Sequence, residues 1–307
     1  MSEQPTFSVV IAAHNAAATL PATIGSVLQQ TRQDYEVIVV DDGSVDGTDE
    51  ALRRTTDDSR VSYLRKEQSG PADSRNMGIE AAGGSFVCFL DSDDLWLPTY
   101  LQAMADAFDS EPTASLAYTD AWRLDDRTRR IFRAPIMTTV DPPRRLPREP
   151  EALLLELLRR NFVYTSSTVR RAVLLEVGGF TTFARSEDYE LWLRIAATGH
   201  TFVRTVGLHA VYRDRPGSRI HNPSAMTQGR FEIYDHVVRT YDLAPDARAL
   251  AEAQVQRAKD DLAALDGAQD IAEVKRSAPR RLARDLRLFR RFPPSEVGKA
   301  FPDLHAV

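Results

Sequence analysis

The amino-acid sequence predicts an α/β fold: a mostly parallel β-sheet flanked by helices, followed by a helical C-terminal extension. Over the first 120 residues, continuous apolar and β-branched runs alternate with segments whose apolar residues recur every three or four positions. The chain of 307 residues is 43% hydrophobic and 27% charged, an ordinary globular mixture. This length suffices for one large domain, or for one domain with an appendage.

The elements are expected in a regular order. Strands are predicted at 7–13, 35–40, 60–65, 85–90 and 114–120, and the first two are expected to be buried. Helices are predicted between and after them at 19–31, 47–56, 71–82 and 97–108. The alternation breaks at 125–150, which is rich in Arg and Pro and is expected to be a loop or short hairpin. Further helices are expected at 151–161, 170–180, 187–200, and from about 223 to the end.

Charge and cysteine content exclude several classes of protein. The net charge of −5 argues against a globally basic nucleic-acid binder, so no nucleic-acid partner is expected. The single cysteine, Cys88, cannot form an internal disulfide. The sequence shows neither a signal-peptide pattern nor an apolar run near the ~20 residues that span a bilayer. We therefore expect a cytoplasmic globular protein.

Polar residues follow three of the predicted strands. The first strand ends at His14-Asn15, the second at Asp41-Asp42-Gly43-Ser44 and the fourth at Asp91-Ser92-Asp93-Asp94. Ligands of open α/β sheets bind beyond the carboxyl ends of the strands, and clustered carboxylates favour Mg²⁺ or Mn²⁺. Taken singly, each motif is also explained by a turn or a helix cap. We expect Asp94 to be such a cap.

Two common phosphate-binding motifs are absent from the sequence. It contains no G-x-G-x-x-G, which disfavours a dinucleotide-binding loop, and no G-x-x-x-x-G-K-[ST], which disfavours a P-loop.

Four segments, in order, resemble family 2 glycosyltransferases of the GT-A fold: SVVIAAHNAAATL, DYEVIVVDDGSVDGT, GPADSRNMGIEAAGGSFVCFLDSDD and SEDYELWLRIAATGH. The resemblance covers about residues 5–220. It implies a Rossmann-like GT-A domain at 1–222, with a nucleotide half at about 1–120 and an acceptor half at about 121–222, before an extension at 223–307. It also implies inverting transfer of a sugar from a UDP- or dTDP-linked donor.

The resemblance assigns residues to the nucleotide. Ala12 and His14 look like the strand end that holds the base, with His14 where the family often has tyrosine. Asp42 resembles the acceptor for the base N3–H, which favours uracil or thymine. Arg75 looks like a nucleotide contact near that acid, although a surface arginine paired with an acid of its own helix is the alternative.

Asp91-Ser92-Asp93 resembles the DxD motif of the family. Asp93 would ligate Mn²⁺ or Mg²⁺ bridging the donor phosphates, while Asp91 and Ser92 would contact the nucleotide, with Asp91 also helping to hold the metal. Where the family often has a histidine, this chain has Arg215, whose guanidinium can clamp a diphosphate but cannot ligate a metal. His221 or His209 is the alternative ligand.

Glu187-Asp188 resembles the ED motif of the family. An inverting displacement needs one base for the acceptor hydroxyl, and the resemblance implies Asp188 in that role with Glu187 in support. The alternative is favourable charge in the first turn of a helix. Trp192, on the same helix, is expected to pack in the core.

Two other classes of protein share some of these features. A nucleotidyltransferase also binds a nucleotide–metal complex, but it usually has a glycine-rich basic loop after its first strand, and AAHNAAATL has neither glycine nor lysine or arginine. A non-catalytic sugar-nucleotide or glycan-binding module would not need an acid at Asp188.

The sequence indicates only broad expectations for the acceptor and for the C-terminal extension. The acceptor is expected to be a glycan, a lipid-linked or a small molecule, as in cell-surface polysaccharide biosynthesis, with 125–150 as an acceptor loop. Residues 275–291 are basic and amphipathic, so this segment could contact the inner face of a membrane peripherally. We favour the alternative, in which its apolar face packs on the main domain or on a second subunit in a homodimer.

Overall fold

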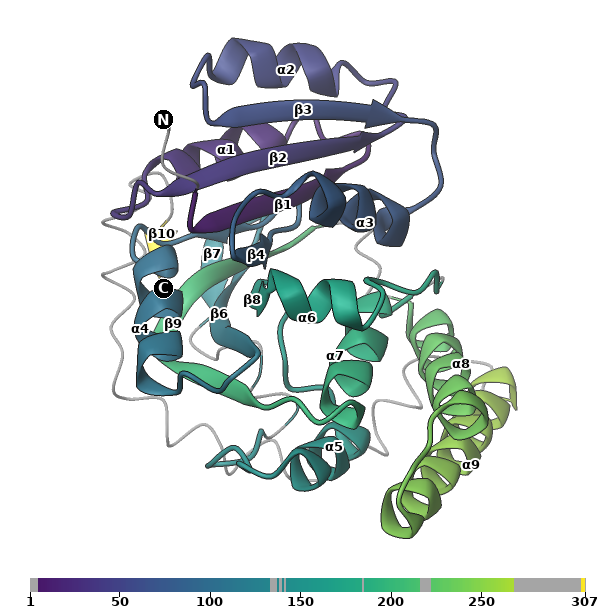
Figure 1. The fold of residues 1–307 in the computed structure, drawn as a ribbon. Coiled ribbons are helices and arrows are strands. Elements are labelled where there is room, and N and C mark those ends of the chain that lie inside the picture. Colours follow the sequence, from purple (N-terminus) through teal and green to yellow (C-terminus); the bar gives the residue numbers. More distant parts are fainter. Residues whose placement is uncertain are drawn as a thin grey trace.

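The computed structural model describes residues 5–132, 137, 140, 142–183, 185–215, 222–267 and 305–306. Within these residues the strands form one mixed sheet with helices on both faces (Figure 1). The main path of the sheet runs β10-β7-β6-β8-β4-β1-β2-β3, and β9 joins it by pairing with β6. The predicted α/β class is therefore confirmed.

The half of the sheet formed by the first strands is parallel. Its strands lie in the order β4-β1-β2-β3 and match the predicted runs closely: β1 (Phe7–Ala13), β2 (Tyr35–Asp42), β3 (Val61–Lys66) and β4 (Phe86–Phe89). The helices that connect or follow them are α1 (Leu20–Leu28), α2 (Thr48–Thr55), α3 (Pro71–Ala81) and α4 (Tyr100–Ser110). Because these strands are parallel, their carboxyl ends lie at one edge.

Two hydrophobic cores cover the two faces of this parallel half. Successive side chains of β1 point to opposite faces, so Val10 belongs to one core while Val9 and Ile11 belong to the other. The core around Val10 receives side chains from α3 and α7, and the core around Val9 receives them from α1 and α4. Because both faces of β1 are buried, its sequence is a continuous apolar run.

The second half of the sheet is mixed. β8 (Ser167–Arg170) lies antiparallel between β4 and β6 (Leu116–Asp125). β6 forms a hairpin with β7 (Arg130–Phe132), as expected for the start of 125–150, and pairs in parallel with β9 (Phe202–Asp214). The remaining elements here are β5 (Leu95–Trp96), α5 (Pro150–Arg159), α6 (Arg171–Glu176) and α7 (Glu187–Ala197).

The predicted helix at 170–180 is shorter than expected. α6 ends at Glu176, and Gly178 and Gly179 follow with φ of 81° and 69°, a left-handed conformation that terminates helices. Arg170, the first residue of the predicted helix, is the last residue of β8.

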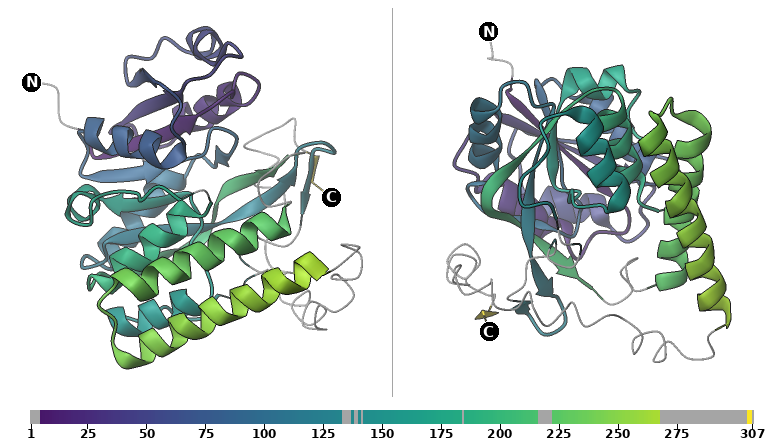
Figure 2. Two further views of the ribbon diagram at one scale, coloured as in Figure 1. Left: turned by 90° about the vertical axis from the view of Figure 1, so that its right-hand side faces the viewer. Right: turned by 90° about the horizontal axis from the view of Figure 1, so that it is seen from below.

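The C-terminal helices α8 (Pro223–Thr240) and α9 (Pro245–Gly267) pack on each other and lie along one side of the molecule (Figure 2). The prediction of helix to the end is wrong at His305–Ala306, which forms β10 beside β7. Residues 275–291, the predicted basic amphipathic segment, and His221 lie outside the described residues. No helix in the described ranges combines the length and the apolarity that crossing a bilayer requires.

Candidate active site

The ends of β1 and β2 are joined by side-chain hydrogen bonds. The Nδ1–H of His14 donates to the carbonyl of Asp42 at 2.7 Å, and the side-chain amides of Asn15 and Gln68 lie 3.0 and 3.3 Å from its Nε2. Both ring nitrogens of this exposed side chain are thus engaged. Ala12 precedes this end within β1.

Asp42 holds the turn that leads into α3. Its carboxylate accepts hydrogen bonds from the backbone N–H groups of Ser69 (2.9 Å) and Gly70 (2.8 Å) and from Lys66 Nζ (2.9 Å). Burial opposes ionisation, but these donors outweigh it and lower the pKa of Asp42. A carboxylate has about four lone-pair positions, and these three donors use three of them.

Arg75 connects two of the predicted acid motifs. The residue is 6% exposed, and its guanidinium donates to Asp91 Oδ1 at 2.8 Å and to Glu187 Oε1 at 2.5 Å. It also lies 5.3 Å from the centre of the Phe180 ring. Burial lowers its pKa, but the two carboxylates outweigh burial and raise it. The alternative of a surface arginine paired with an acid of its own helix is wrong.

The DxD segment follows β4. Asp93 Oδ2 lies 2.8 Å from Arg215, the arginine that replaces the expected histidine. Burial and the neighbouring Asp91 raise the pKa of Asp93, against the effect of Arg215. The carbonyl of Ser92 accepts a hydrogen bond from Thr23 on α1 at 3.0 Å.

Asp94 is not a helix cap, contrary to the prediction. α4 begins at Tyr100, and Asp94 is instead buried, accepting hydrogen bonds from the Tyr164 hydroxyl and from the backbone N–H of Arg213 at 2.9 Å. It therefore ties the DxD turn to β9. The sequence could not show this, because both partners come from distant segments.

The chemistry of this segment suits a divalent cation completed by substrate. Within the described ranges no three His, Cys, Asp or Glu side chains gather at a point that could hold a metal ion by themselves. Mg²⁺, however, is usually bound by one or two carboxylates together with substrate phosphates. Asp91 and Asp93 supply such a pair, so these residues fit a metal that arrives with a diphosphate.

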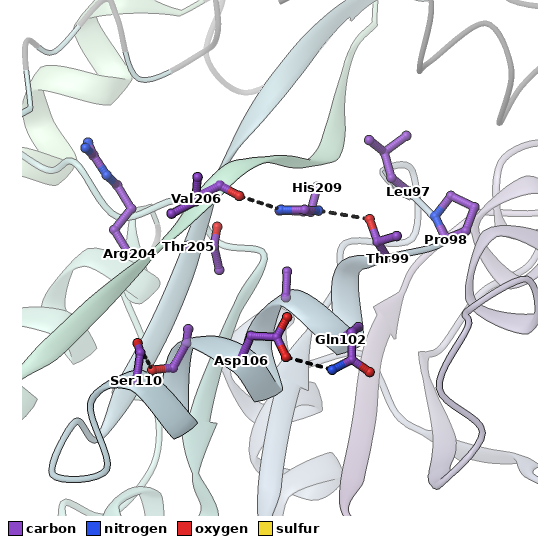
Figure 3. Close-up of a pocket in the computed structure, with 12 residues that line it drawn as sticks. Leu97, Pro98, Thr99, Gln102, Asp106, Ser110, Arg204, Thr205, Val206 and His209 are labelled. Atoms are coloured by element: carbon purple, nitrogen blue, oxygen red, sulfur yellow. Dashed lines mark hydrogen bonds between the residues drawn. The ribbon is translucent and has the colours of Figure 1, made fainter.

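His209 does not lie with this carboxylate pair. Its ring nitrogens bond to the hydroxyl of Thr99 (3.1 Å) and to the carbonyl of Val206 (2.9 Å), in a hollow of about 860 Å³ between α4 and β9 (Figure 3). Apart from His209, none of the described residues predicted for the site lines this hollow. With both ring nitrogens occupied, His209 is a poor candidate for the missing metal ligand.

Asp188 lies in the first turn of α7, beside Glu187. Its Oδ2 accepts a hydrogen bond from the Thr165 hydroxyl at 2.7 Å, and its Oδ1 accepts one from the backbone N–H of Tyr189 at 2.8 Å. Burial and the neighbouring Glu187 raise the pKa of Asp188 to about 6. Thr165 was not predicted, because nothing in its local sequence marks it. Trp192 is fully buried, as expected.

Comparison of the sequence identifies its relatives. The model of Glycosyl transferase family 2 matches residues 8–178. The chain is 32% identical over 218 residues to the succinoglycan biosynthesis protein ExoO of Rhizobium meliloti (strain 1021), covering 70% of this chain and 62% of ExoO. It is 27% identical over 212 residues to the Escherichia coli UDP-Glc:alpha-D-GlcNAc-diphosphoundecaprenol beta-1,3-glucosyltransferase WfaP, covering 69% of this chain and 78% of WfaP.

Other relatives are much longer proteins. An uncharacterized glycosyltransferase of Rickettsia bellii (strain RML369-C) is 36% identical over 119 residues, which are 39% of this chain but only 17% of the relative. The chain thus spans less than a fifth of that protein.

Solved structures confirm the fold. S. aureus TarS 1-349 superposes with a TM-score of 0.63 at 18% identity, covering 87% of this chain and 76% of TarS. The mannosyltransferase PcManGT from Pyrobaculum calidifontis, in complex with GDP-Man and Mn²⁺, gives 0.61 at 18% identity, covering 94% and 81%. Since the family model matches more than half of the chain and the architecture agrees, the chain belongs to glycosyl transferase family 2 and has a GT-A fold.

Proposed function

We propose that this enzyme transfers a sugar from a UDP- or dTDP-linked donor to an acceptor hydroxyl, with inversion, in a single displacement for which Asp188 is the base. The observation that carries the proposal is the buried Arg75, which bonds both to Asp91 of the donor motif and to Glu187 beside Asp188. Groups for the leaving nucleotide and for the attacking hydroxyl therefore belong to one connected network.

The ends of β1 and β2 support a pyrimidine donor. With its ring nitrogens engaged, His14 would stack its ring face on the base, and the remaining lone-pair position of Asp42 would accept an N3–H, which uracil and thymine have and cytosine lacks. The name of WfaP specifies UDP-Glc, and TarS has been solved with UDP-GlcNAc. PcManGT was solved with GDP-Man, so a guanine donor is the alternative that a nucleotide screen must test.

Asp93 and Asp91 would hold Mn²⁺ or Mg²⁺ together with the donor phosphates. When bound, the cation neutralises the charge that develops on the departing nucleoside diphosphate. Arg215, 2.8 Å from Asp93, would contact the same phosphates and share that charge.

Asp188 has the properties of a general base. A pKa of about 6 leaves it ionised at neutral pH while keeping it a stronger base than an exposed aspartate. Glu187 is bonded to Arg75, and it would support the base or bind acceptor hydroxyls.

For the acceptor, we propose a glycan or lipid-linked molecule bound beside the half formed by residues 121–222. The name of WfaP, which specifies a diphosphoundecaprenol-linked sugar, supports this class of acceptor and a role in cell-surface polysaccharide synthesis. Family membership argues against the nucleotidyltransferase and the non-catalytic module considered above.

The replacement Asp188→Asn tests the proposal. It keeps the shape of the side chain and removes the base, so transfer or slow hydrolysis of UDP- and dTDP-sugars should fall by about 10²–10⁴-fold, while the Kd for UDP stays within about twofold. Release of nucleoside diphosphate and calorimetric UDP binding are the measurements, and Asp246→Asn on the exposed start of α9 is the control. Unchanged turnover, or joint loss of binding and turnover, would contradict the assignment of Asp188.

A further inference from the structure

Two consecutive residues just before β8 contact the two acid motifs of the site. The hydroxyl of Tyr164 donates to Asp94 Oδ2, and the hydroxyl of Thr165 donates to Asp188 Oδ2 at 2.7 Å. We propose that Tyr164 and Thr165 are positioning residues, which fix the catalytic carboxylate relative to the donor-binding acids. The inference rests on the proposed function and adds two residues to it.

On the donor side, Tyr164 acts through Asp94. That carboxylate is 1% exposed, and its other oxygen accepts the backbone N–H of Arg213 at 2.9 Å. Arg213 precedes by two residues Arg215, whose guanidinium lies against Asp93. The Tyr164–Asp94 contact thus anchors the end of β9 that brings Arg215 to the DxD motif.

On the base side, the hydroxyl of Thr165 donates a hydrogen bond to Asp188 from outside α7. The other bond comes from the backbone N–H of Tyr189, the next residue of the same helix. The charged groups that act on Asp188 are Glu187 from its own helix and Arg75 from α3. Thr165 therefore fixes the orientation of the carboxylate relative to the rest of the protein.

The segment carrying both hydroxyls is held by the sheet. The carbonyl of Thr165 accepts the backbone N–H of Ser167 at 2.7 Å, and Ser167 is the first residue of β8, which pairs with both β4 and β6. Ser166, between them, is buried, and its hydroxyl accepts a hydrogen bond from the Trp96 indole at 3.3 Å. Both contacts are therefore fixed to β8. This strand lies next to β4, and the DxD motif directly follows β4.

Removing one hydroxyl at a time separates the effect of Thr165 on the base from the effect of Tyr164 on donor binding. A hydroxyl that donates to a carboxylate favours its charged form, so Thr165→Val should raise the pKa of Asp188 by about one unit. It should also move the acid limb of the kcat–pH profile upward and lower kcat roughly tenfold with the donor KM unchanged. Thr165→Ser should restore the wild-type values. Tyr164→Phe should instead weaken UDP binding about tenfold without changing the pKa of Asp188.

The experiment combines two readouts on the full chain. Carbon-13 NMR of labelled aspartate, with Asp188→Asn for assignment, measures the pKa of Asp188, and release of UDP from UDP-sugars measures turnover. An upward pKa shift in Thr165→Val that serine reverses supports the proposal, whereas an unchanged pKa and kcat would overturn it. If the wild-type enzyme releases no nucleotide from any donor, the proposed function fails, and the NMR titration still decides the role of Thr165.

Discussion

Asp120 on β6 shows how burial raises the pKa of a single carboxyl group in this protein. Its Oδ1 accepts hydrogen bonds from the backbone N–H groups of Ala121 (2.7 Å) and Met137 (3.0 Å). Burial nevertheless raises its pKa from 3.8 to about 6, against these bonds and Arg204. The folded protein then binds the proton more tightly than the unfolded chain, so the free energy of unfolding falls as pH rises from about 4 to about 6.

Asp120→Asn keeps an oxygen for both backbone donors and removes the buried charge. We expect it to raise the free energy of unfolding by about 1–3 kcal/mol at pH 7.5, since each pKa unit corresponds to about 1.4 kcal/mol. The gain should shrink to zero near pH 4, where the wild-type carboxyl is protonated. Urea denaturation at both pH values measures it, with the exposed Asp246→Asn as control. A gain of equal size at both pH values would contradict the assigned cause.

At the scale of elements, the C-terminal helices α8 and α9 pack against the rest of the molecule. Ile233 and Val237 of α8 are fully buried and belong to the same core as side chains of α5 and α7. Tyr241, just after α8, donates to Glu190 on α7 at 2.6 Å. These contacts lead us to expect that the C-terminal helices unfold together with the family 2 domain, although the sequence predicts a boundary at residue 222.

Ile233→Ala tests that expectation. Loss of a fully buried isoleucine side chain should lower the free energy of unfolding by about 2–5 kcal/mol and keep one cooperative transition. Arg239→Ala, on an exposed side chain of the same helix, should change it by less than about 0.5 kcal/mol. Urea unfolding followed by circular dichroism and by tryptophan fluorescence gives the measurement. A separate early transition of helical signal would show that α8 and α9 form an independent unit.

For the molecule as a whole, the site depends on contacts between the two halves of the chain. Arg75 on α3 bonds to Glu187 on α7, and the side-chain amide of Asn76 bonds to both backbone groups of Phe180 at 2.7 and 2.9 Å. Phe180 in turn packs its ring against Arg75. Residues 1–120 and 121–222, the proposed nucleotide and acceptor halves, are therefore joined at the proposed site, so we expect donor binding to require both.

The parallel half of the fold and the acids at its edge were predictable because each depends on local sequence. Continuous apolar runs marked β1, β2 and β4, and polar residues followed each one. β9 was not predicted as a strand from its composition, since Gly207 with φ of 99° interrupts it and its pairing with β6 shifts register. β8 has the sequence STVR, which contains no continuous apolar run, so nothing local marked it as a strand.

The partners of the acids could not be predicted, because they depend on tertiary contacts. Arg75 lies 112 residues from Glu187 in the chain, and Tyr164 lies 70 residues from Asp94. Local sequence favoured a cap for Asp94, since a helix was expected shortly after it. Only the fold shows that its carboxylate is buried against β9.

Calorimetric titration of UDP, dTDP, GDP and CDP, with and without Mn²⁺, tests the donor site most directly. The wild-type protein should bind UDP or dTDP in a Mn²⁺-dependent manner, and Asp93→Ala should lose that binding, because Asp93 would hold the cation against the donor phosphates. Binding of no nucleotide, or Mn²⁺-independent binding that Asp93→Ala leaves intact, would contradict a metal-assisted donor site at the end of β4.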